Sequence, residues 1–475
     1  MIIDLLKERV VQNLPFIPNS QQDLLITNLS EFLISNQSDA VFLMQGYAGT
    51  GKTSLVGALV KTLTELNQKT VLLAPTGRAA KVFSSYAGHP AFTIHKKIYR
   101  QKAFSVDMEG FQISDNLQKN TLFIVDEASM ISNSSDGSSF GTGRLLDDLI
   151  EYVFGGENCK LLILGDIAQL PPVGQIASPA LQPQTLRAFG LHVSYYCLTE
   201  VARQAKDSGI LFNATRLREL MEKGEPYDLP QLKLAGFSDV RKVSGTELIE
   251  EIDCAYGRDG LDETIIITRS NKRANQFNMG IRNQILYRED ELNGGDLLLV
   301  AKNNYHWGKD VKEIDFIANG DIMEVKRVRR IQEMYGFRFA DVEVRFPDYD
   351  VVLEVKIILD TLHSEAPALS LEMNQKLFEE IYADYEGIPS QRERIRRVKE
   401  DPFFNALQVK YAYAVTCHKA QGGQWKNVFL DMGYINKEHL GLDFYRWLYT
   451  AFTRSTENLW LVNIADEFID QSAPV

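Results

Sequence analysis

The chain has 475 residues, of which 45% are hydrophobic and 24% charged, and its net charge is −12. This length predicts about three domains, and this composition is that of a soluble globular protein. No apolar run approaches the roughly 18 residues that a membrane span requires, so no membrane contact is expected. The negative charge argues against a basic nucleic-acid coat, although one positive groove can coexist with an acidic exterior.

The first residues, MIIDLLKERVVQNL, carry four charged side chains inside an apolar pattern. This predicts an amphipathic helix and not a signal peptide. The four cysteines, Cys159, Cys197, Cys254 and Cys417, lie far apart and form no CxxC pair. Such spacing favours reduced thiols over a disulfide framework or a zinc site. We therefore expect a cytoplasmic protein, and we expect it to be a monomer.

In the first two hundred residues, short apolar runs alternate with stretches of helical periodicity. The apolar runs span 40–46, 69–76, 120–129 and 160–166. Each is nearly continuous, as expected for strands buried on both faces of a sheet. Helical spacing is found at 54–66 and 144–154. This order predicts an α/β fold in which helices cover both faces of a parallel sheet.

A second α/β pattern begins at 263–286, a strand followed by a helix, and resumes at residue 411. The segment between these parts has a different hydrophobic pattern. Three runs there alternate with period two, which predicts a small antiparallel barrel, and two charged helical stretches follow as an arm. The predicted domains are a first lobe at 1–205, a second lobe in two parts at 206–310 and 407–475, and an inserted barrel with its arm at 311–406.

The stretch GYAGTGKT, Gly46 to Thr53, matches G-x-x-x-x-G-K-[ST] and lies between a predicted strand and a predicted helix. Glycines let the backbone wrap a phosphate with its N–H groups, and the start of the helix adds positive charge. Lys52 can then reach the β- and γ-phosphates, and the Thr53 hydroxyl can ligate Mg²⁺. The residues predicted to bind nucleotide here are Gly46, Gly49, Thr50, Gly51, Lys52, Thr53 and Ser54.

Two carboxylates follow a buried strand in IVDEAS. Asp126 ends the strand, where it can hold the Mg²⁺ shell, and Glu127 can activate water. Attack by water predicts an ATPase or GTPase, and ATP is favoured because no guanine-reading NKxD sequence follows. Gln169, in GDIAQLPPVG, can sense the γ-phosphate or position water; alternatively, it belongs to a turn before Pro171.

Two arginines at element ends are candidate arginine fingers: Arg203 in LTEVARQ and Arg454 in LYTAFTRS. An exposed arginine is by default a surface residue, so these two act on ATP only if a second lobe closes over it. The neighbouring pair Cys417 and His418 raises the alternative of a metal site. That alternative is weak because no second ligand pair stands at metal spacing.

The ordered set GYAGTGKT, APTGRAAK, TIH, VDEASM, GDIAQLPPVG, LTEVARQ, TCHKAQG and YTAFTRS resembles the motifs of superfamily 1 helicases. It is most similar to class B, the branch with RecD-like and phage Dda-like DNA helicases. The resemblance implies two RecA-like lobes, an SH3-like domain in the inserted segment, and ATP and Mg²⁺ as ligands. It also implies 5′→3′ movement on single-stranded DNA and unwinding of 5′-tailed duplex; no residue pattern shows the direction.

The same resemblance assigns further residues. Gln21 is similar to the glutamine that reads adenine, with Gln22 as the alternative register, and Gln421 and Gly422 are expected to face the nucleotide cleft. Many relatives carry a ribose-binding carboxylate two residues after that glycine, where this chain has Gln424. The residues expected to contact the nucleic-acid strand are Pro75, Thr76, Thr93 and His95 on the first lobe and Asn271, Thr416, His418 and Lys419 on the second.

The family's strand-splitting hairpin is expected at about 96–119, where Phe104 or Phe111 is either the pin or a packing residue. The leading hypothesis is therefore an ATP-dependent 5′→3′ DNA helicase that works with replication or repair proteins. The alternative is an ATP-gated single-strand-binding subunit or remodeller of a recombination or repair complex that does not unwind by itself. A P-loop kinase is disfavoured because Glu127 suits water as the nucleophile. An RNA substrate stays open, since phosphate and stacking contacts barely distinguish the two sugars.

Overall fold

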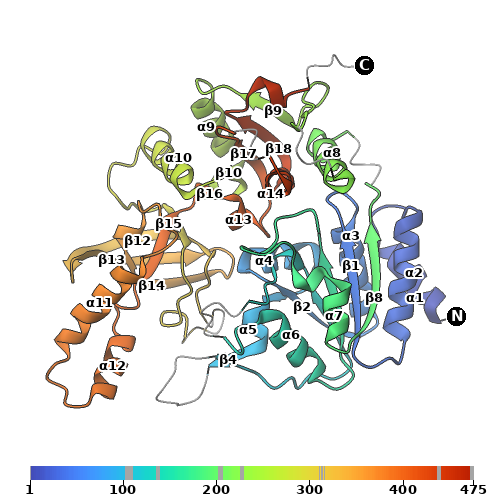
Figure 1. The fold of residues 1–475 in the computed structure, drawn as a ribbon, viewed down its shortest axis with the longest axis horizontal. Helices are drawn as coiled ribbons and strands as arrows, with labels where there is room; N and C mark the ends of the chain where they lie inside the picture. The colour runs from blue at the N-terminus through green and yellow to red at the C-terminus, as the bar shows by residue number, and fades with distance from the viewer. Residues whose placement is uncertain are drawn as a thin grey trace.

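The computed structural model describes residues 2–101, 111–134, 140–201, 207–224, 229–309, 311, 314, 316–435 and 440–470. They form two lobes with parallel sheets and a closed barrel that carries a helical arm. In Figure 1 the first lobe lies at the lower right, the second lobe at the top, and the barrel with its arm at the left. Within the described ranges, no helix is both long and apolar enough to cross a membrane.

The first lobe is built on a six-stranded sheet in which all neighbouring strands are parallel. In spatial order the strands are β3 (Ala91–Thr93), β2 (Lys69–Ala74), β6 (Thr121–Val125), β7 (Lys160–Gly165), β1 (Ala40–Gly46) and β8 (His192–Leu198). Along β1, Val41 and Leu43 pack into one apolar cluster, while Phe42 and Met44 pack into another. The sheet is thus buried on both faces, which explains the continuous apolar runs and confirms the predicted α/β layering.

Helices cover the two faces of this sheet as separate groups. The face of Phe42 packs against α1 (Ile2–Asn13), α2 (Ser20–Ile34), α3 (Lys52–Glu65) and α4 (Gly77–Ala87). The face of Val41 packs against α5 (Ile94–Ile98), α6 (Leu145–Phe154) and α7 (Pro183–Ala188). Short 3-10 turns occupy Ala128–Met130 and Pro179–Leu181. The predicted hairpin exists as an antiparallel pair of β4 (Tyr99–Gln101) and β5 (Phe111–Ile113).

The second lobe has a five-stranded parallel sheet. Its strands, in spatial order, are β16 (Ala414–Thr416), β10 (Thr264–Thr268), β17 (Trp425–Asp431), β18 (Ser455–Val462) and β9 (Val240–Val243). Its helices are α8 (Gly209–Lys223), α9 (Leu248–Asp259), α10 (Asn271–Gln284), α13 (Cys417–Ala420) and α14 (Leu442–Phe452), with 3-10 turns at Leu261–Glu263 and Asp466–Phe468. Both halves of the chain that were predicted to share this lobe contribute strands to it.

The inserted domain is a closed barrel, as predicted, but it is larger than the predicted segment. Its strands are β11 (Leu297–Val300), β12 (Ile322–Met334), β13 (Phe337–Phe346), β14 (Val351–Ile358) and β15 (Leu407–Tyr411). The first and last strands lie outside 311–406, because β11 pairs with both β12 and β15 to close the barrel. A short apolar strand looks the same whether it belongs to a buried sheet or to a barrel, so its pattern could not show this.

The helical arm follows the barrel as predicted. It consists of α11 (Leu371–Asp384) and α12 (Gln391–Glu400), with a 3-10 turn at Leu359–Thr361 before it. Leu377, Ile381 and Val398 on these helices pack against Phe337 and Phe339 of β13. The arm is therefore fixed to the barrel by an apolar core of its own and extends away from both lobes (Figure 1).

Candidate active site

The glycine-rich loop lies between β1, which ends at Gly46, and α3, which begins at Lys52. Gly49 and Gly51 have φ angles of +75° and +88°, in the left-handed region that favours glycine. A Cβ on Gly51 would also lie 2.7 Å from Nε2 of Gln22, too close for any side chain. Both constraints let the backbone turn sharply into the helix, whose first N–H groups are the donors that a phosphate requires.

Lys52 and the threonines of the loop have distinct surroundings. The Lys52 ammonium donates to the carbonyl oxygens of Gly46 and Tyr47 and lies 4.0 Å from Oδ2 of Asp166. Thr50 is buried and its hydroxyl donates to the Tyr47 oxygen, so its side chain supports the loop itself. The Thr53 side chain is exposed beside a cleft of about 500 Å³ between the lobes and the barrel, while Ser54 is half-buried.

The two candidate glutamines of α2 have separate partners. The Gln22 amide is buried: its oxygen accepts from Asn19 N–H, and its nitrogen donates to the Thr50 oxygen at 2.9 Å. It thus caps α2 and supports the glycine-rich loop. The Gln21 amide, partly exposed, is bonded to Thr199 and to the Glu200 N–H, just before the segment with Arg203. The adenine-reading role stays a prediction for Gln21, whereas the Gln22 side chain is occupied by hydrogen bonds that stabilise α2 and the loop.

Asp126 and Glu127 stand at the carboxyl end of β6, as predicted. The Asp126 carboxylate accepts from the Tyr86 hydroxyl and from the Glu127 N–H at 2.7 Å. Glu127 has a φ of +51°, in the left-handed region that a non-glycine residue rarely adopts. Such strain is typical of functional positions, where the surrounding structure enforces it.

The Glu127 carboxylate faces the second lobe. Its Oε1 lies 3.8 Å from Nη1 of Arg454, a buried arginine at the end of α14. Burial raises the pKa of Glu127 above its ordinary value, and the carboxylates of Asp126 and Asp166 raise it further, whereas the charges of Arg454 and Lys52 oppose this shift. A carboxyl with a raised pKa is a stronger base when it is ionised, which suits a group that removes a proton from water.

Two backbone oxygens of the second lobe position Arg454, one in α14 and one in the loop after α13. It donates Nε to the Thr450 oxygen and Nη1 to the Gly423 oxygen, at 3.1 and 3.2 Å. These bonds hold the planar guanidinium across the boundary between the lobes. The other candidate finger, Arg203, lies outside the described residues.

The segment with Gln169 is held from the second lobe on both sides of Leu170. The Thr450 hydroxyl accepts from the Leu170 N–H at 2.9 Å, and the Gln421 amide donates to the Leu170 oxygen at 2.7 Å. Gln421 is therefore buried where the two lobes meet, and its contact with the nucleotide stays a prediction. The buried Gln169 Oε1 has no hydrogen-bond partner among the described residues, so it can accept a hydrogen bond from water or from a ligand.

Gly422 is a point of contact between the two lobes. Its φ is +73°, and a Cβ there would lie 2.8 Å from Cβ of Ala79 in α4. The exposed Gln424 contributes its backbone oxygen to Arg78, whose guanidinium also lies over the Trp425 ring. The position at which many relatives carry a ribose-binding carboxylate is therefore used here, through its backbone, to join the lobes.

Two of the four predicted strand-contacting residues of the first lobe cap helices. Thr76 and Thr93 accept from the N–H groups of Ala79 and Lys96, so each starts a helix at the carboxyl end of a strand. Pro75 precedes Thr76 and is half-buried. These positions remain compatible with phosphate contacts from helix N-termini.

His95 packs in an aromatic cluster. Its ring lies against Phe140 with centroids 4.8 Å apart, and against Tyr99 and Phe316. Burial lowers its pKa to about 4, so it stays neutral at physiological pH. A contact of His95 with the nucleic-acid strand stays a prediction, and a neutral ring would make it. The TIH motif gave no sign of this packing, because the aromatic partners come from distant segments.

Phe111 belongs to the same aromatic cluster. Its ring lies 4.7 Å from Phe140 and 5.0 Å from Tyr305, which precedes the barrel strand β12. It is thus a packing residue that joins the hairpin to the inserted domain. Phe104 lies outside the described residues, so a role as pin stays a prediction for that position.

The residues of the second lobe that are predicted to contact the strand lie at the carboxyl ends of β16 and β10. Thr416 precedes α13, whose His418 is exposed, and Asn271 is the first residue of α10. Lys419 donates to the Asn319 side chain of the inserted domain, and burial lowers its pKa to about 8. Cys417 is buried with its thiol near the Trp447 oxygen, and among the described residues no group of three or more metal-ligating side chains occurs.

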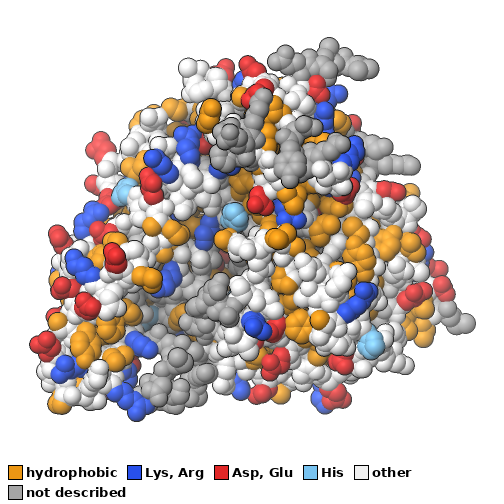
Figure 2. All heavy atoms as spheres, in the orientation of Figure 1, with side chains coloured by type: hydrophobic (Ala, Val, Ile, Leu, Met, Phe, Trp, Pro, Cys, Tyr) orange, Lys and Arg blue, Asp and Glu red, His pale blue; other side chains and the backbone are white. Residues whose placement is uncertain are grey.

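Surface charge is mixed on the face shown in Figure 2, where Lys and Arg alternate with Asp and Glu. Lys326 and Arg329 of β12, for example, are paired with Glu324 and Glu343. These basic residues of the barrel thus belong to a mixed, largely exposed surface.

Comparison with known proteins agrees with this arrangement. The family described as AAA domain matches residues 30–223, and the UvrD-like helicase C-terminal domain matches residues 411–462. The ATP-dependent DNA helicase dda of Enterobacteria phage T4 is 25% identical, with 66% of this chain and 68% of that protein covered. The ATP-dependent RecD2 DNA helicase of Deinococcus radiodurans is 22% identical over 88% of this chain and 46% of that protein. The chain is thus similar to class B helicases of superfamily 1 in both of its lobes.

Two further similarities extend over nearly the whole helicase. An uncharacterized protein of Acanthamoeba polyphaga mimivirus is 21% identical, over 93% of this chain and 99% of its own length. A solved structure of Pif1 helicase from Bacteroides in complex with ADP-AlF3 and ssDNA covers 96% of this chain and 95% of that chain. Its sequence identity is 15% and its TM-score 0.48.

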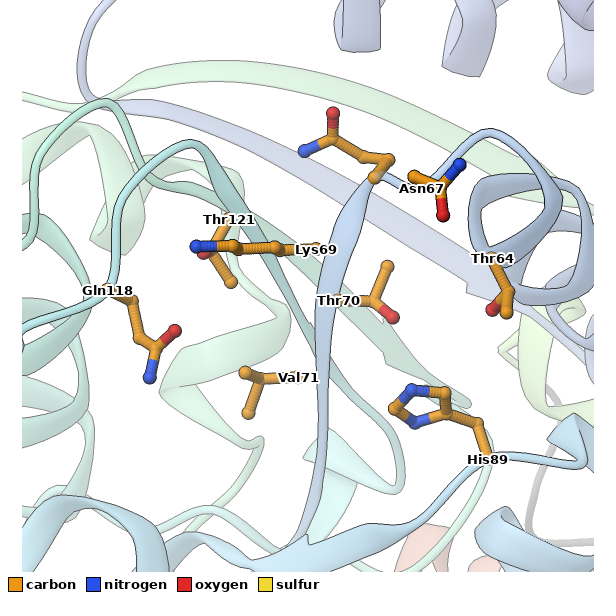
Figure 3. Close-up of a pocket in the computed structure, with 9 residues that line it drawn as sticks. Thr64, Asn67, Lys69, Thr70, Val71, His89, Gln118 and Thr121 are labelled. Atoms are coloured by element: carbon orange, nitrogen blue, oxygen red, sulfur yellow. The ribbon is translucent and has the colours of Figure 1, made fainter.

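One pocket of the helicase lies away from the nucleotide site. It has a volume of about 360 Å³ and lies beside Lys69 and Thr70, where β2 begins, with Thr64 and His89 on its wall (Figure 3). The strands of this sheet are parallel, so all of them begin on the side where β2 begins. The glycine-rich loop follows the carboxyl end of β1, so the pocket and the loop lie at opposite ends of the strands. The pocket therefore takes no part in ATP binding.

Several residues of the helicase site carried no signal in the sequence. Tyr86, which donates to Asp126, is part of an amphipathic helix pattern. Arg218 of α8 stacks over the Tyr47 ring at 4.5 Å and donates to the Thr199 oxygen. Tyr449 of α14 donates to Asp166 across the lobes. To find them from the sequence, one would have to know which segments of the two lobes contact each other.

Proposed function

We propose that this helicase hydrolyses ATP to move 5′→3′ along single-stranded DNA and to unwind duplex DNA with a 5′ tail. The observation that carries the proposal is that the short loop 416–422 contacts two different domains. Lys419 donates to Asn319 of the inserted domain, while Gln421 and Gly422 are buried against Leu170 and Ala79 of the first lobe. A movement at one side of this short loop therefore displaces the other.

The ATPase part of the proposal rests on residues from both lobes. The glycine-rich loop and Lys52 bind the phosphates, Glu127 removes a proton from the attacking water, and Arg454 stabilises charge on the transferred group. Thr53 and Asp126 would hold Mg²⁺, which binds proteins through few carboxylates and mainly through substrate phosphates. When bound, Mg²⁺ neutralises developing charge on the phosphate oxygens. Because Arg454 comes from the second lobe, hydrolysis requires that this lobe be docked on the first.

The strand part rests on residues at the carboxyl ends of the strands. Helix N-termini at Thr76 and Thr93 and the side chains of Thr416, His418 and Lys419 favour phosphate contacts, which bind a strand without reading its sequence. Closing of the lobes on ATP and opening after hydrolysis would then shift these contacts along the strand. The names of the relatives, dda and RecD2, which are DNA helicases, favour DNA as the substrate.

Two measurements test the proposal. ATP turnover should rise steeply when single-stranded DNA is added, and turnover indifferent to nucleic acid would contradict it. Purified protein should then unwind a duplex with a 5′ overhang and not one with a 3′ overhang. DNA-stimulated turnover without any unwinding would support the alternative, an ATP-gated single-strand-binding subunit of a repair or recombination complex. An equal response to RNA would widen the substrate class.

Lys419→Ala is expected to weaken single-strand binding and to reduce its salt dependence. Loss of one phosphate contact should lower the slope of log affinity against log salt by about 0.7. Asn319→Ala is the matched control, because it removes the contact of Lys419 with the inserted domain but keeps the charge. An unchanged salt slope in Lys419→Ala would exclude the phosphate contact.

The same lysine predicts a pH dependence. Its pKa is lowered to about 8, so its charge is lost as pH rises through that value. Affinity for single-stranded DNA should therefore fall between pH 7 and about 9 in the wild type. In Lys419→Ala this part of the pH dependence should disappear. Fluorescence anisotropy with a labelled oligonucleotide measures both effects.

A further inference from the structure

Tyr449 of α14 connects the second lobe to the phosphate-binding machinery of the first. It is 1% exposed. Its hydroxyl donates to Oδ2 of Asp166 at 2.6 Å and accepts from the N–H of Ala48 at 2.8 Å. Ala48 belongs to the glycine-rich loop, and Asp166 directly follows β7, three residues before Gln169. One hydroxyl group thus touches two elements of the ATPase site from the opposite lobe.

The Asp166 oxygen that accepts this hydrogen bond is also the one closest to Lys52, whose Nζ lies 4.0 Å away. Asp166 is 2% exposed, so its charge depends on these neighbours. The other Asp166 oxygen accepts from the Ala168 N–H. If the Tyr449 donor is lost, Lys52 becomes the main remaining partner of Oδ2, which draws the lysine toward Asp166 and away from a phosphate.

The hydroxyl of Tyr449 is a dependable donor. Burial and the Asp166 charge raise its pKa well above the ordinary value of 10.0, so it stays protonated at working pH. The next residue, Thr450, accepts from the Leu170 N–H, and Arg454, two residues after the helix ends, reaches Glu127. Helix α14 and the residues directly after it therefore present three neighbouring groups to three parts of one site.

We propose that Tyr449 is a positioning residue for ATP hydrolysis. Its hydroxyl holds Asp166 and the glycine-rich loop in the geometry that leaves Lys52 available, and it does so only when α14 is docked on the first lobe. This inference rests on the proposed ATPase function. It makes α14 a second connection between the lobes, in addition to the loop 416–422.

Tyr449→Phe is the direct test, because it removes the hydroxyl and keeps the ring volume. We expect kcat for DNA-stimulated ATP hydrolysis to fall on the order of tenfold to a hundredfold. The KM for ATP should change less than kcat does, and single-strand affinity without nucleotide should be unchanged. A purely structural role would lower the unfolding temperature without this split.

Tyr413→Phe is the matched control. The Tyr413 hydroxyl is also buried and also bonds a carboxylate, Asp296, and a backbone N–H, that of Leu297, but it lies outside the ATPase site. Both variants should lose similar thermal stability, and only Tyr449→Phe should lose kcat. Equal kcat values for the two variants would overturn the proposal.

A double-mutant cycle with Asp166→Asn separates action through Asp166 from a general effect. If Tyr449 acts through Asp166, the double variant should be no slower than the slower single variant. Additive losses would overturn the proposal. Absence of ATP hydrolysis in the wild type would instead overturn the proposed function, so the two failures are distinguishable.

Discussion

Glu127→Gln is expected to lower kcat for ATP hydrolysis at least about a hundredfold while ATP binding is retained. Gln keeps the size of the side chain and tolerates the φ of +51° no worse than Glu, but it cannot accept a proton from water. The glycine-rich loop, Lys52 and Thr53 are unchanged in this variant. The dissociation constant for a labelled ATP analogue and single-turnover hydrolysis measure the two parts separately.

The raised pKa of Glu127 predicts two pH effects that can be measured, one on the reaction rate and one on stability. The base is active only when ionised, so wild-type kcat/KM should fall as pH drops through the raised pKa. A carboxyl whose pKa rises on folding destabilises the folded state above its ordinary pKa of 4.5, and this cost disappears as pH falls. Glu127→Gln should therefore unfold at the same temperature as wild type or higher at pH 7.

Glu291→Gln is the matched control for this experiment. The Glu291 side chain is 23% exposed, compared with 21% for Glu127, and it pairs with Arg338 beside the barrel. Its loss should leave kcat unchanged and should lower stability slightly. Retained hydrolysis in Glu127→Gln would remove Glu127 from the role of general base.

Arg454→Gln is expected to lower kcat on the order of a thousandfold, the effect typical of an arginine finger. The guanidinium is buried at the lobe boundary, so no water replaces its charge near the transferred phosphate. Its removal also takes away the largest interaction that opposes the raised pKa of Glu127. The acid limb of the pH–rate profile should therefore move to higher pH in this variant.

Two further variants separate charge from geometry. Arg454→Lys keeps the charge but not the planar fork that bonds Thr450 and Gly423, so kcat should fall while the acid limb stays near its wild-type position. Arg446→Gln changes an arginine of α14, the helix that precedes Arg454; it donates to the Ile176 oxygen outside the ATPase site. It should have wild-type kcat. An Arg454→Gln variant within threefold of wild type would show that the finger is a different residue.

The parts of this helicase that could be predicted are those formed by neighbouring residues. The loop from Gly46 to Thr53 is shaped by glycine dihedrals and by the start of one helix, so its motif predicts its geometry. The carboxylates Asp126 and Glu127 follow from a strand that ends at a sheet edge. The alternation of apolar runs likewise predicted both lobes, since strands buried on two faces have a recognisable pattern.

The sequence was less informative where partners come from distant segments. The His95 ring packs against Phe140 and Phe316, and no local pattern indicates those rings. The strands β11 and β15 close the barrel although their apolar runs suit a parallel sheet equally well. Gln21 and Gln22 are adjacent, and only their contacts distinguish them.

The sequence by itself determined where the motif typical of phosphate binding lies and how its backbone turns, because such motifs are short and have fixed spacing. Only the tertiary structure decided how the second lobe takes part. Tyr449 is 283 residues from Asp166 and 401 from Ala48 along the chain, yet it bonds to both. Such contacts depend on how two separately folded lobes pack together. Many side-chain contacts together determine that packing, and no single motif predicts it.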